Sequence, residues 1–199
     1  MRLLLATRNA KKLVELRRIL AASTNIELVG LNDVPQYPEA PETALTFAGN
    51  ALAKARDGAR ETGLPCVADD SGLAVDALNG MPGVFSARWS GRHGDDQANL
   101  DLLLGQMGDI AAPDRGAAFV CAAAMVFPGG EEQVVHGEVR GEILTGPRGE
   151  GGFGYDPIFL PEGSDLTAAE MTPEQKDAIS HRGKAFRELA ELLVSRQIS

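Results

Sequence analysis

The segment 117–127 is the longest apolar run in this sequence, and it constrains the fold more than any other feature. Its valine, phenylalanine and methionine residues favour a central strand over a helix. Residues 134–144 alternate in polarity enough to be its partner strand, with a hairpin at Gly129-Gly130 between them. Shorter apolar runs predict further strands, at 3–6, 26–29 and 65–68.

Helical patterns are interspersed with these strands. Asn9 is a good cap residue, and apolar residues recur at helical spacing over 13–20. The same spacing over 43–62, with Leu45 on its apolar face and Gly63 at its end, predicts a second helix. Further helices are predicted at 97–107, 173–179 and 181–194. We therefore expect one α/β domain, 199 residues long and large enough to bury a core, with one lobe or two.

Composition excludes several classes of protein. The formal net charge is −9, from 19 Lys and Arg against 28 Asp and Glu, which argues against non-specific binding to DNA or RNA and against an anionic membrane surface. No apolar stretch reaches the length of a membrane span, and the N-terminus becomes polar at Thr7, too early for a signal peptide. Cys66 and Cys121 lie inside apolar runs and are expected to be buried thiols in a reducing compartment. We therefore predict a cytoplasmic protein.

Four polar segments lie where apolar runs end, which is where α/β proteins place ligand-binding loops. They are residues 7–12, 68–73, 153–156 and 180–183. In that order they bring lysines at a predicted helix start, paired carboxylates, an aromatic ring and a His-Arg pair. Such groups can neutralise phosphates, hold a divalent metal, stack on a base and hydrogen-bond to its edge. Their combination predicts an enzyme that acts on nucleoside triphosphates.

The first polar segment, Thr7-x-Asn9-x-x-Lys12, lies between a predicted strand and a predicted helix. Backbone N–H groups and the helix dipole favour an anion there, and a lysine adds a full positive charge. These residues could therefore contact phosphates. Alternatively, Asn9 only caps the helix and the lysines are solvated. The segment lacks the glycine and lysine spacing of a P-loop.

The second polar segment holds Asp69 and Asp70. Adjacent side chains of a strand point to opposite faces, so these two carboxylates are expected to have separate roles. One could bind Mg²⁺ or take a proton from water while the other braces the loop, although an Asp-Asp-Ser-Gly turn is an equal alternative. Glu42 is a candidate second metal ligand, or simply a favourable charge at a helix start.

Lys54 and Arg88 could add positive charge to such a site. Lys54 shares a helix face with Asn50, at a spacing of four residues. For a lone lysine on a helix, solvent exposure is the simpler interpretation. The same holds for Arg88, although Trp89 beside it suggests an oriented guanidinium.

The last two polar segments could recognise a base. Phe153 offers a stacking plane after a glycine-rich loop, and Asp156 could accept a hydrogen bond from a base N–H group. His181 and Arg182 could donate to a base carbonyl, which favours a 6-oxo purine over adenine. The alternative is a plain helix start with Ser180 as its cap.

Taken together, these segments resemble the inosine triphosphate pyrophosphatase family, which hydrolyses non-standard purine nucleoside triphosphates. The matching pieces run in order over nearly the whole chain: Thr7-x-Asn9-x-x-Lys12, Glu42-Thr43 with Phe47-x-x-Asn50-Ala51-x-x-Lys54-Ala55, Ala68 to Leu78, Gly152 to Pro157, and Lys176-x-x-x-Ser180-His181-Arg182-Gly183. The Asp-Asp-Ser-Gly-Leu form looks like the bacterial branch, the dITP/XTP pyrophosphatases. Two positions depart from the pattern, since Arg8 stands where many relatives have Gly and Gly49 where Glu is frequent.

The resemblance implies a two-lobed α/β fold, in which a single domain over 1–199 holds a long mixed central sheet flanked by helices. It places the active site in the cleft between the lobes and implies a homodimer. It also implies Mg²⁺-dependent hydrolysis of ITP, dITP and XTP to the monophosphate and pyrophosphate.

The resemblance also implies roles residue by residue. Asp70 would be the metal ligand and catalytic base, with Asp69 as the reserve base and Glu42 as a further ligand of Mg²⁺. The phosphates would be bound by Thr7, Arg8, Asn9, Ala10, Lys11 and Lys12, assisted by Lys54 and Arg88. The nucleoside would be contacted by Ser71, Phe153, Gly154, Tyr155, Asp156, Lys176, His181 and Arg182.

Two alternatives remain at this stage. A Maf-type nucleotide pyrophosphatase has a related fold and prefers other bases, but the segments at 153–156 and 181–182 argue against it. A nucleotide-binding sensor without catalysis would not need carboxylates that activate water.

Overall fold

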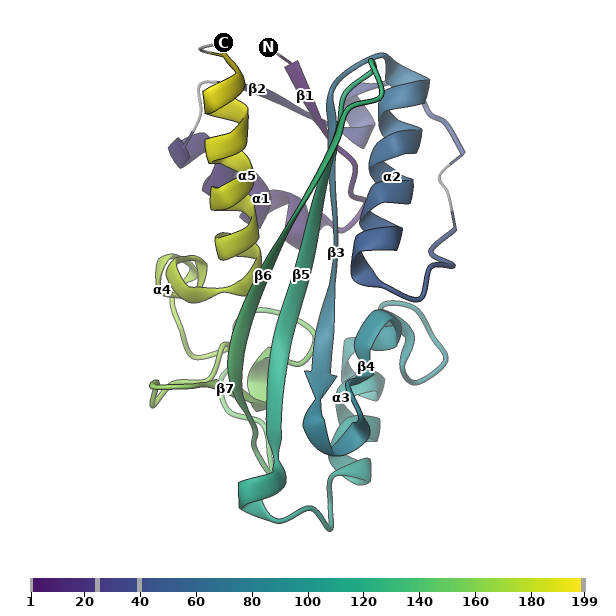
Figure 1. Cartoon of the computed structure of the whole chain (residues 1–199). Coiled ribbons are helices and arrows are strands. Elements are labelled where there is room, and N and C mark those ends of the chain that lie inside the picture. The colour runs from purple at the N-terminus through teal and green to yellow at the C-terminus, as the bar shows by residue number, and fades with distance from the viewer. Residues whose placement is uncertain (1, 24–25, 39–40, 198–199) are drawn as a thin grey trace. The chain divides into compact units, whose positions relative to one another are not determined.

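The computed structural model describes residues 2–23, 26–38 and 41–197, and Figure 1 shows its helices and strands. The strands are β1 Arg2–Leu5, β2 Glu27–Gly30, β3 Cys66–Val75, β4 Met81–Pro82, β5 Gly116–Val126, β6 Glu132–Ile143 and β7 Phe159–Pro161. The α-helices are α1 Ala10–Ser23, α2 Phe47–Thr62, α3 Asp96–Gln106, α4 Pro173–Ile179 and α5 His181–Gln197. The predicted α/β class, with a mixed sheet flanked by helices, is confirmed.

The chain divides into two compact units. Unit 1 comprises Met1–Asp70, Cys121–Gly137 and Arg182–Ser199, and unit 2 comprises Ser71–Val120 and Glu138–His181. Strands β3, β5 and β6 each begin in one unit and end in the other. No described helix is long and apolar enough to cross a membrane.

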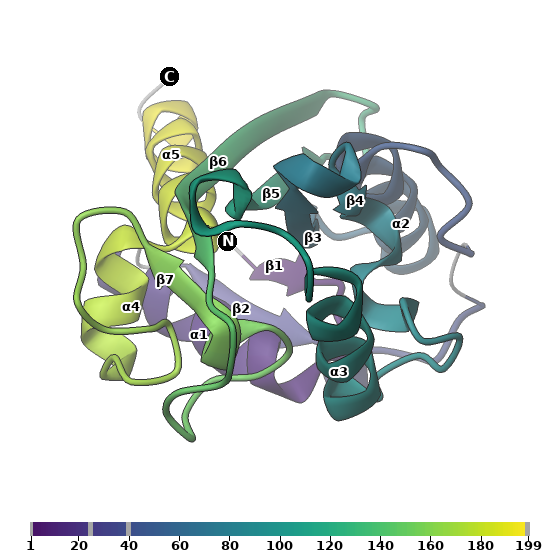
Figure 2. The same ribbon diagram turned by 90° about the horizontal axis from the view of Figure 1, so that it is seen from below.

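In unit 1 the strands follow the order β2-β1-β3-β5-β6, and β1 runs parallel to both of its neighbours. Side chains alternate across this sheet. Leu3 and Leu5 pack with α1 and α5, whereas Leu4 packs with α2 on the opposite face. Both views show α2 on the side of the sheet opposite to α1 and α5 (Figures 1 and 2). Full burial of each such leucine stabilises the fold by about 1.5–3 kcal/mol.

The predicted helix at 43–62 begins later than expected. Its first residue is Phe47, because the Thr46 hydroxyl accepts a hydrogen bond from the Gly49 N–H and so caps the helix there. Leu45, predicted on the apolar face, precedes the helix and is 86% exposed. The predicted end at Gly63 is confirmed, since Gly63 adopts φ 66°, a left-handed conformation that costs glycine little.

The predicted strand at 65–68 is too short, and the predicted loop after it is wrong. β3 continues to Val75, so Asp69 and Asp70 lie inside a strand and not in a turn. Asp is unfavourable in strands, but both carboxylates find cationic or amide partners on neighbouring helices of unit 1. Beyond them, Leu73 and Val75 are buried in the core of unit 2 and extend the strand.

In unit 2 the strands follow the order β3-β5-β6-β7, and β4 pairs with the end of β3. Its core packs α3 against β3, β5 and β7. The buried Arg115 guanidinium donates to four backbone carbonyls, those of Met107, Ile110, Ile143 and Leu144. The end of α3 is thereby joined to the end of β6.

Several local predictions are confirmed. The hairpin between β5 and β6 turns at Gly129-Gly130, where the Gly130 N–H donates to the Phe127 carbonyl at 2.9 Å. Cys66 and Cys121 are buried free thiols, and burial raises the pKa of Cys66 to about 12.

Candidate active site

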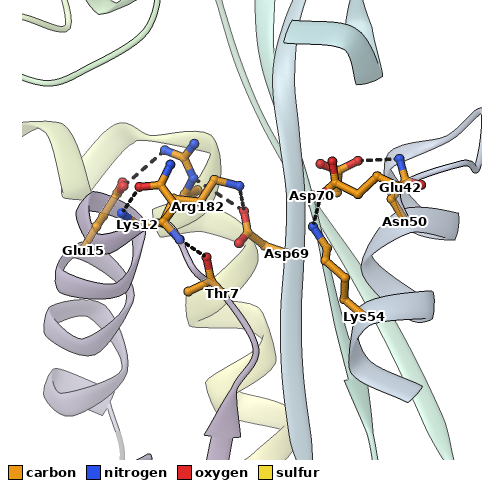
Figure 3. Close-up of polar contacts among 10 residues, drawn as sticks. Thr7, Lys12, Glu15, Glu42, Asn50, Lys54, Asp69, Asp70 and Arg182 are labelled. Atoms are coloured by element: carbon orange, nitrogen blue, oxygen red, sulfur yellow. Dashed lines mark hydrogen bonds and ion pairs between the residues drawn. The ribbon is translucent and has the colours of Figure 1, made fainter. Parts of the chain in front are cut away.

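Asp69 and Asp70 point to opposite faces of β3, as the alternation of a strand predicts (Figure 3). Val67 packs on the α1 and α5 face, and Asp69 follows it with a spacing of two. Ala68 packs on the α2 face, and Asp70 follows it in the same way. The two carboxylates therefore have different partners.

Asp69 pairs with cationic side chains on the face of β3 that packs against α1 and α5. Its Oδ2 atom lies 2.8 Å from the Lys12 Nζ atom of α1 and 3.7 Å from the Arg182 Nε atom of α5. Arg182 in turn pairs with Glu15 at 3.2 Å, and both of these side chains are 7% exposed. Burial alone would raise the pKa of Asp69, but the positive charges of Lys12, Arg182 and Lys54 outweigh it and hold that pKa well below its usual range. Asp69 is therefore a fixed negative charge.

Asp70 has weaker charge compensation. Its Oδ2 atom accepts a hydrogen bond from the Asn50 side-chain amide at 2.9 Å. Burial, reinforced by the negative charge of Glu42, raises the pKa of Asp70 above its usual value, although Lys54 and Asn50 oppose the shift. A carboxylate with a raised pKa is better suited to accept a proton than one held ionised.

Lys54 is not solvated, so the simpler prediction for it was wrong. Its ammonium donates to the Glu42 Oε1 atom at 2.7 Å, and its side chain is 14% exposed. Burial lowers its pKa, but the charges of Asp69, Asp70 and Glu42 outweigh that effect and the pKa is raised. Lys54 therefore stays protonated beside the carboxylates.

The segment 7–12 forms the entry to α1. Asn9 caps the helix, since its Oδ1 atom accepts from the Lys12 N–H at 3.1 Å, and the Thr7 hydroxyl accepts from the Asn9 N–H. Lys12 is not solvated but pairs with Asp69, whereas Arg8 and Lys11 are exposed. Ala10 is the first residue of α1.

In unit 2, the segment 152–156 is held by its own carboxylate. The Asp156 Oδ2 atom accepts from the Phe153 N–H at 2.7 Å and from the Lys176 ammonium, which lies 5.1 Å from the centre of the Phe153 ring. Gly152 has φ 70°, and a Cβ atom there would lie 2.1 Å from the Asp156 carboxylate, so the turn requires glycine. Asp156 is buried and hydrogen-bonded within the protein.

Three further predicted nucleoside contacts, Ser71, Tyr155 and His181, are also in unit 2, whereas Arg182 belongs to unit 1. Tyr155 is buried in the core of that unit, and its hydroxyl donates to the Ser86 carbonyl. His181 is buried and stacks on Phe119 with 4.9 Å between the ring centres. Ser71 in β3 is half-buried. Arg88, predicted to assist phosphate binding, lies over the ring of Phe85, with 5.3 Å from its guanidinium carbon to the ring centre.

Comparison with known proteins decides the family. The model of the Ham1 family matches residues 3–192. The chain belongs to the Ham1 family. A dITP/XTP pyrophosphatase from Nocardia farcinica is 65% identical over 196 residues, which cover 98% of this chain and 95% of the relative.

Solved Ham1-type structures agree with the fold. The crystal structure of a nucleoside-triphosphatase, or dITP/XTP pyrophosphatase, from Mycobacterium abscessus is 62% identical, with a TM-score of 0.79 over 95% of this chain and 98% of that one. A HAM1 protein from Coxiella burnetii is 40% identical, with a TM-score of 0.87 over 98% of this chain and 99% of that one. The predicted resemblance is thus confirmed.

Three polar residues of this Ham1 chain were missed as parts of the site. Glu15 pairs with Arg182, Asn50 binds Asp70, and Asp96 accepts from the Gly154 N–H at 3.1 Å. A signal existed for Glu15, because a charged residue adjoining Leu16 on the apolar side of a helix must find a buried partner. Its partner is 167 residues away, so spacing could not identify it.

Proposed function

We propose that this chain is a dITP/XTP pyrophosphatase, which hydrolyses dITP, ITP and XTP to the monophosphate and pyrophosphate. The observation that carries the proposal is the separation of two buried carboxylates on β3, one held ionised by cations and the other with a raised pKa beside Glu42. The names of relatives at 58–65% identity over nearly the whole chain support the same activity.

The residues on the Asp70 face suit Mg²⁺. Asp70 and Glu42 supply two oxygen ligands, and Mg²⁺ is usually held by one or two carboxylates together with substrate phosphates and water. Among the described residues, no group of three or more His, Cys, Asp or Glu side chains is placed to hold a metal ion. Burial is the main cause of the raised pKa of Asp70, and the negative charge of Glu42 adds to it, so a cation bound by these carboxylates would favour the ionised form of Asp70. When bound, Mg²⁺ would screen phosphate charge and lower the pKa of a coordinated water.

Asp70 is the proposed base. Water would attack the α-phosphorus, because release of intact pyrophosphate requires cleavage between the α and β phosphates. Asp70 would take the proton from that water, while Asp69, paired with Lys12 and Arg182, would stay ionised and hold those cations in place.

Phosphate binding is assigned to cations and to the start of α1. Thr7, Arg8, Asn9, Ala10, Lys11 and Lys12 would surround the phosphates, and Lys54 and Arg88 would stabilise the leaving pyrophosphate. Lys12 pairs with the buried Asp69 and Lys54 with the partly exposed Glu42, so ion pairs hold both ammonium groups before any ligand arrives.

Base recognition is assigned to unit 2 and to Arg182. Phe153 would stack on the base, with Ser71, Gly154, Tyr155, Asp156 and Lys176 as further nucleoside contacts. Tyr155 would contribute through its backbone, because its side chain is buried. If His181 and Arg182 donate to a 6-oxo group, ATP would leave those donors unpaired and be rejected.

The test is pyrophosphate release from dITP, ITP, XTP, GTP and ATP, each with Mg²⁺ and with excess EDTA. We expect metal-dependent release from dITP, ITP and XTP and little from GTP or ATP. Equal turnover of ATP and ITP would refute the donor model. Tight binding of dITP without release would favour a non-catalytic sensor, and a preference for other bases would favour a Maf-type enzyme.

The assembly and location are part of the same proposal. We expect a homodimer in the cytoplasm that binds no DNA or RNA, consistent with the net charge of −9. Light scattering on the purified protein gives the mass of the particle, and a monomer at assay concentration would contradict the dimer.

A further inference from the structure

Asn50 lies where α2 meets both proposed metal ligands. It is the fourth residue of the helix, is 1% exposed and uses both ends of its side-chain amide. We propose that Asn50 is a positioning residue that fixes Asp70 and the Glu42 segment relative to one another. This inference rests on the proposed pyrophosphatase function.

The nitrogen end of the amide orients Asp70. It donates to the Asp70 Oδ2 atom at 2.9 Å, and Asp70 is itself buried (Figure 3). A hydrogen bond to a buried charged group is worth more than one between neutral groups. Asn50 therefore restricts rotation of the Asp70 carboxylate about the Cβ–Cγ bond.

The oxygen end of the same amide holds the segment that carries Glu42. The Asn50 Oδ1 atom accepts from the Ala44 N–H at 2.9 Å, two residues after Glu42. One helical turn further along α2, Lys54 donates to the Glu42 carboxylate at 2.7 Å. Two consecutive turns of α2 thus hold this segment. Asn50 binds its backbone at Ala44, and Lys54 binds the side chain of Glu42.

Gly49 makes this close approach possible. A Cβ atom on Gly49 would lie 2.7 Å from the Ala44 Cβ atom and 3.1 Å from the Thr46 hydroxyl oxygen. The first distance is too short for two carbon atoms, so any larger residue would displace Ala44. Gly49 therefore sets how closely Ala44, and with it the Glu42 segment, lies against α2.

The chemistry explains why position 50 needs an amide. Aspartate would keep the acceptor for Ala44 but lose the donor and place a second negative charge against Asp70. Leucine has a similar size but offers neither function. The two variants therefore separate the Asp70 contact from the Ala44 contact.

The experiment compares Asn50→Asp and Asn50→Leu with Asn99→Leu. Asn99 is a matched control, because it is the fourth residue of α3, is 2% exposed and accepts from the Ser90 N–H at 2.7 Å. For each variant, kcat, the KM for dITP, the Mg²⁺ concentration for half-maximal rate and the melting temperature are measured. Hydrogen exchange of the Ala44 amide gives a readout that is independent of activity.

We expect both Asn50 variants to lose about 10- to 100-fold in kcat or to need that much more Mg²⁺, with a smaller change in KM. The Ala44 amide should exchange faster in Asn50→Leu and stay protected in Asn50→Asp. Asn99→Leu should melt at a lower temperature, as Asn50→Leu does, but keep its kcat within about 3-fold of the wild type. Gly49→Ala, which keeps the amide but displaces Ala44, should lose about 10-fold in kcat.

The outcomes are distinguishable. A wild-type protein that releases no pyrophosphate from dITP or XTP would refute the proposed function. A wild-type enzyme that is active, together with an Asn50→Asp variant of unchanged kcat and Mg²⁺ requirement, would refute the positioning role. Equal losses in the Asn50 and Asn99 variants would also refute it, since they would show a general effect on folding.

Discussion

Helices α2 and α3, one in each unit, begin with the same local arrangement. The cap residue, Thr46 or Asp95, accepts a hydrogen bond from the backbone N–H three residues later. The fourth helical residue is a buried asparagine in both cases, and its side-chain oxygen accepts from a backbone N–H that precedes the helix. Each helix thus fixes the chain segment that leads into it.

The difference lies in what else each helix start contacts. In unit 1 the amide of Asn50 reaches Asp70, a buried carboxylate with a raised pKa. In unit 2 the first helical residue, Asp96, accepts from the Gly154 N–H of the glycine-rich loop. The same local arrangement contacts a buried carboxylate in one unit and a loop in the other. The function of a capped helix start therefore depends on the residue that the tertiary structure packs against it, here Asp70 against α2 and Gly154 against α3.

The largest expected effect comes from replacing Asp70, the proposed proton acceptor. Asp70→Asn should reduce kcat by about 100- to 10,000-fold, the usual contribution of a general base, while nucleotide binding is largely kept. Single-turnover assays and dITP binding by calorimetry measure the two quantities. An unchanged kcat would remove Asp70 from the mechanism.

The two carboxylates of β3 should differ in their effect on stability. Asp69→Asn breaks a buried ion pair and should lower the free energy of unfolding at pH 7 by about 3 kcal/mol. Because the folded-state pKa of Asp69 is lowered, its contribution is complete above its unfolded pKa of about 3.9 and is lost as the pH falls below that value.

Asp70→Asn should not lower the free energy of unfolding at pH 7 as Asp69→Asn does. The folded-state pKa of Asp70 is raised, so its ionised form costs stability at neutral pH, and the neutral amide should leave the protein at least as stable. Urea denaturation of the wild type and both variants at pH 7 and at about pH 3, below the unfolded pKa of Asp, tests the two predictions. Equal destabilisation by the two substitutions at pH 7 would contradict the assignment of distinct roles.

Asp96→Ala should weaken the contact of α3 with the glycine-rich loop and leave Asp70, the proposed base, in place. Loss of a hydrogen bond to a charged acceptor costs about 1.5–3 kcal/mol where it is buried, and Asp96 is half-buried, so we expect the KM for dITP to rise by up to about 10-fold. The kcat should change less. A fall in kcat as large as that of Asp70→Asn would show that the two helix starts are not distinct in function.

The smallest effects are expected at the caps themselves. Thr46→Ala and Asp95→Ala should each cost about 1 kcal/mol of stability, since each removes one hydrogen bond at a helix start. Thr46→Ala should also raise the Mg²⁺ requirement, because Thr46 adjoins the Glu42 segment. Thermal unfolding and Mg²⁺ titration of the two variants check this difference, and identical Mg²⁺ requirements would contradict it.

Much of the fold could be predicted because it depends on local chemistry. The cap at Asn9, the end of α2 at Gly63 and the hairpin at Gly129-Gly130 each require particular residues within a few positions. The error at β3 has a physical cause. Propensity disfavours acids in a strand, and it takes no account of partners on distant helices.

The sequence by itself determined that Asp69 and Asp70 would face apart, because a strand alternates its side chains whatever surrounds it. It also carried the motifs that identify the Ham1 family. Only the tertiary structure decided which carboxylate meets Lys12 and Arg182 and which meets Asn50, because these partners lie on helices packed on opposite faces of the sheet of unit 1. The pKa values of the two residues depend on burial and on charges that are near in space but distant in sequence, so they cannot be predicted from the sequence motif alone.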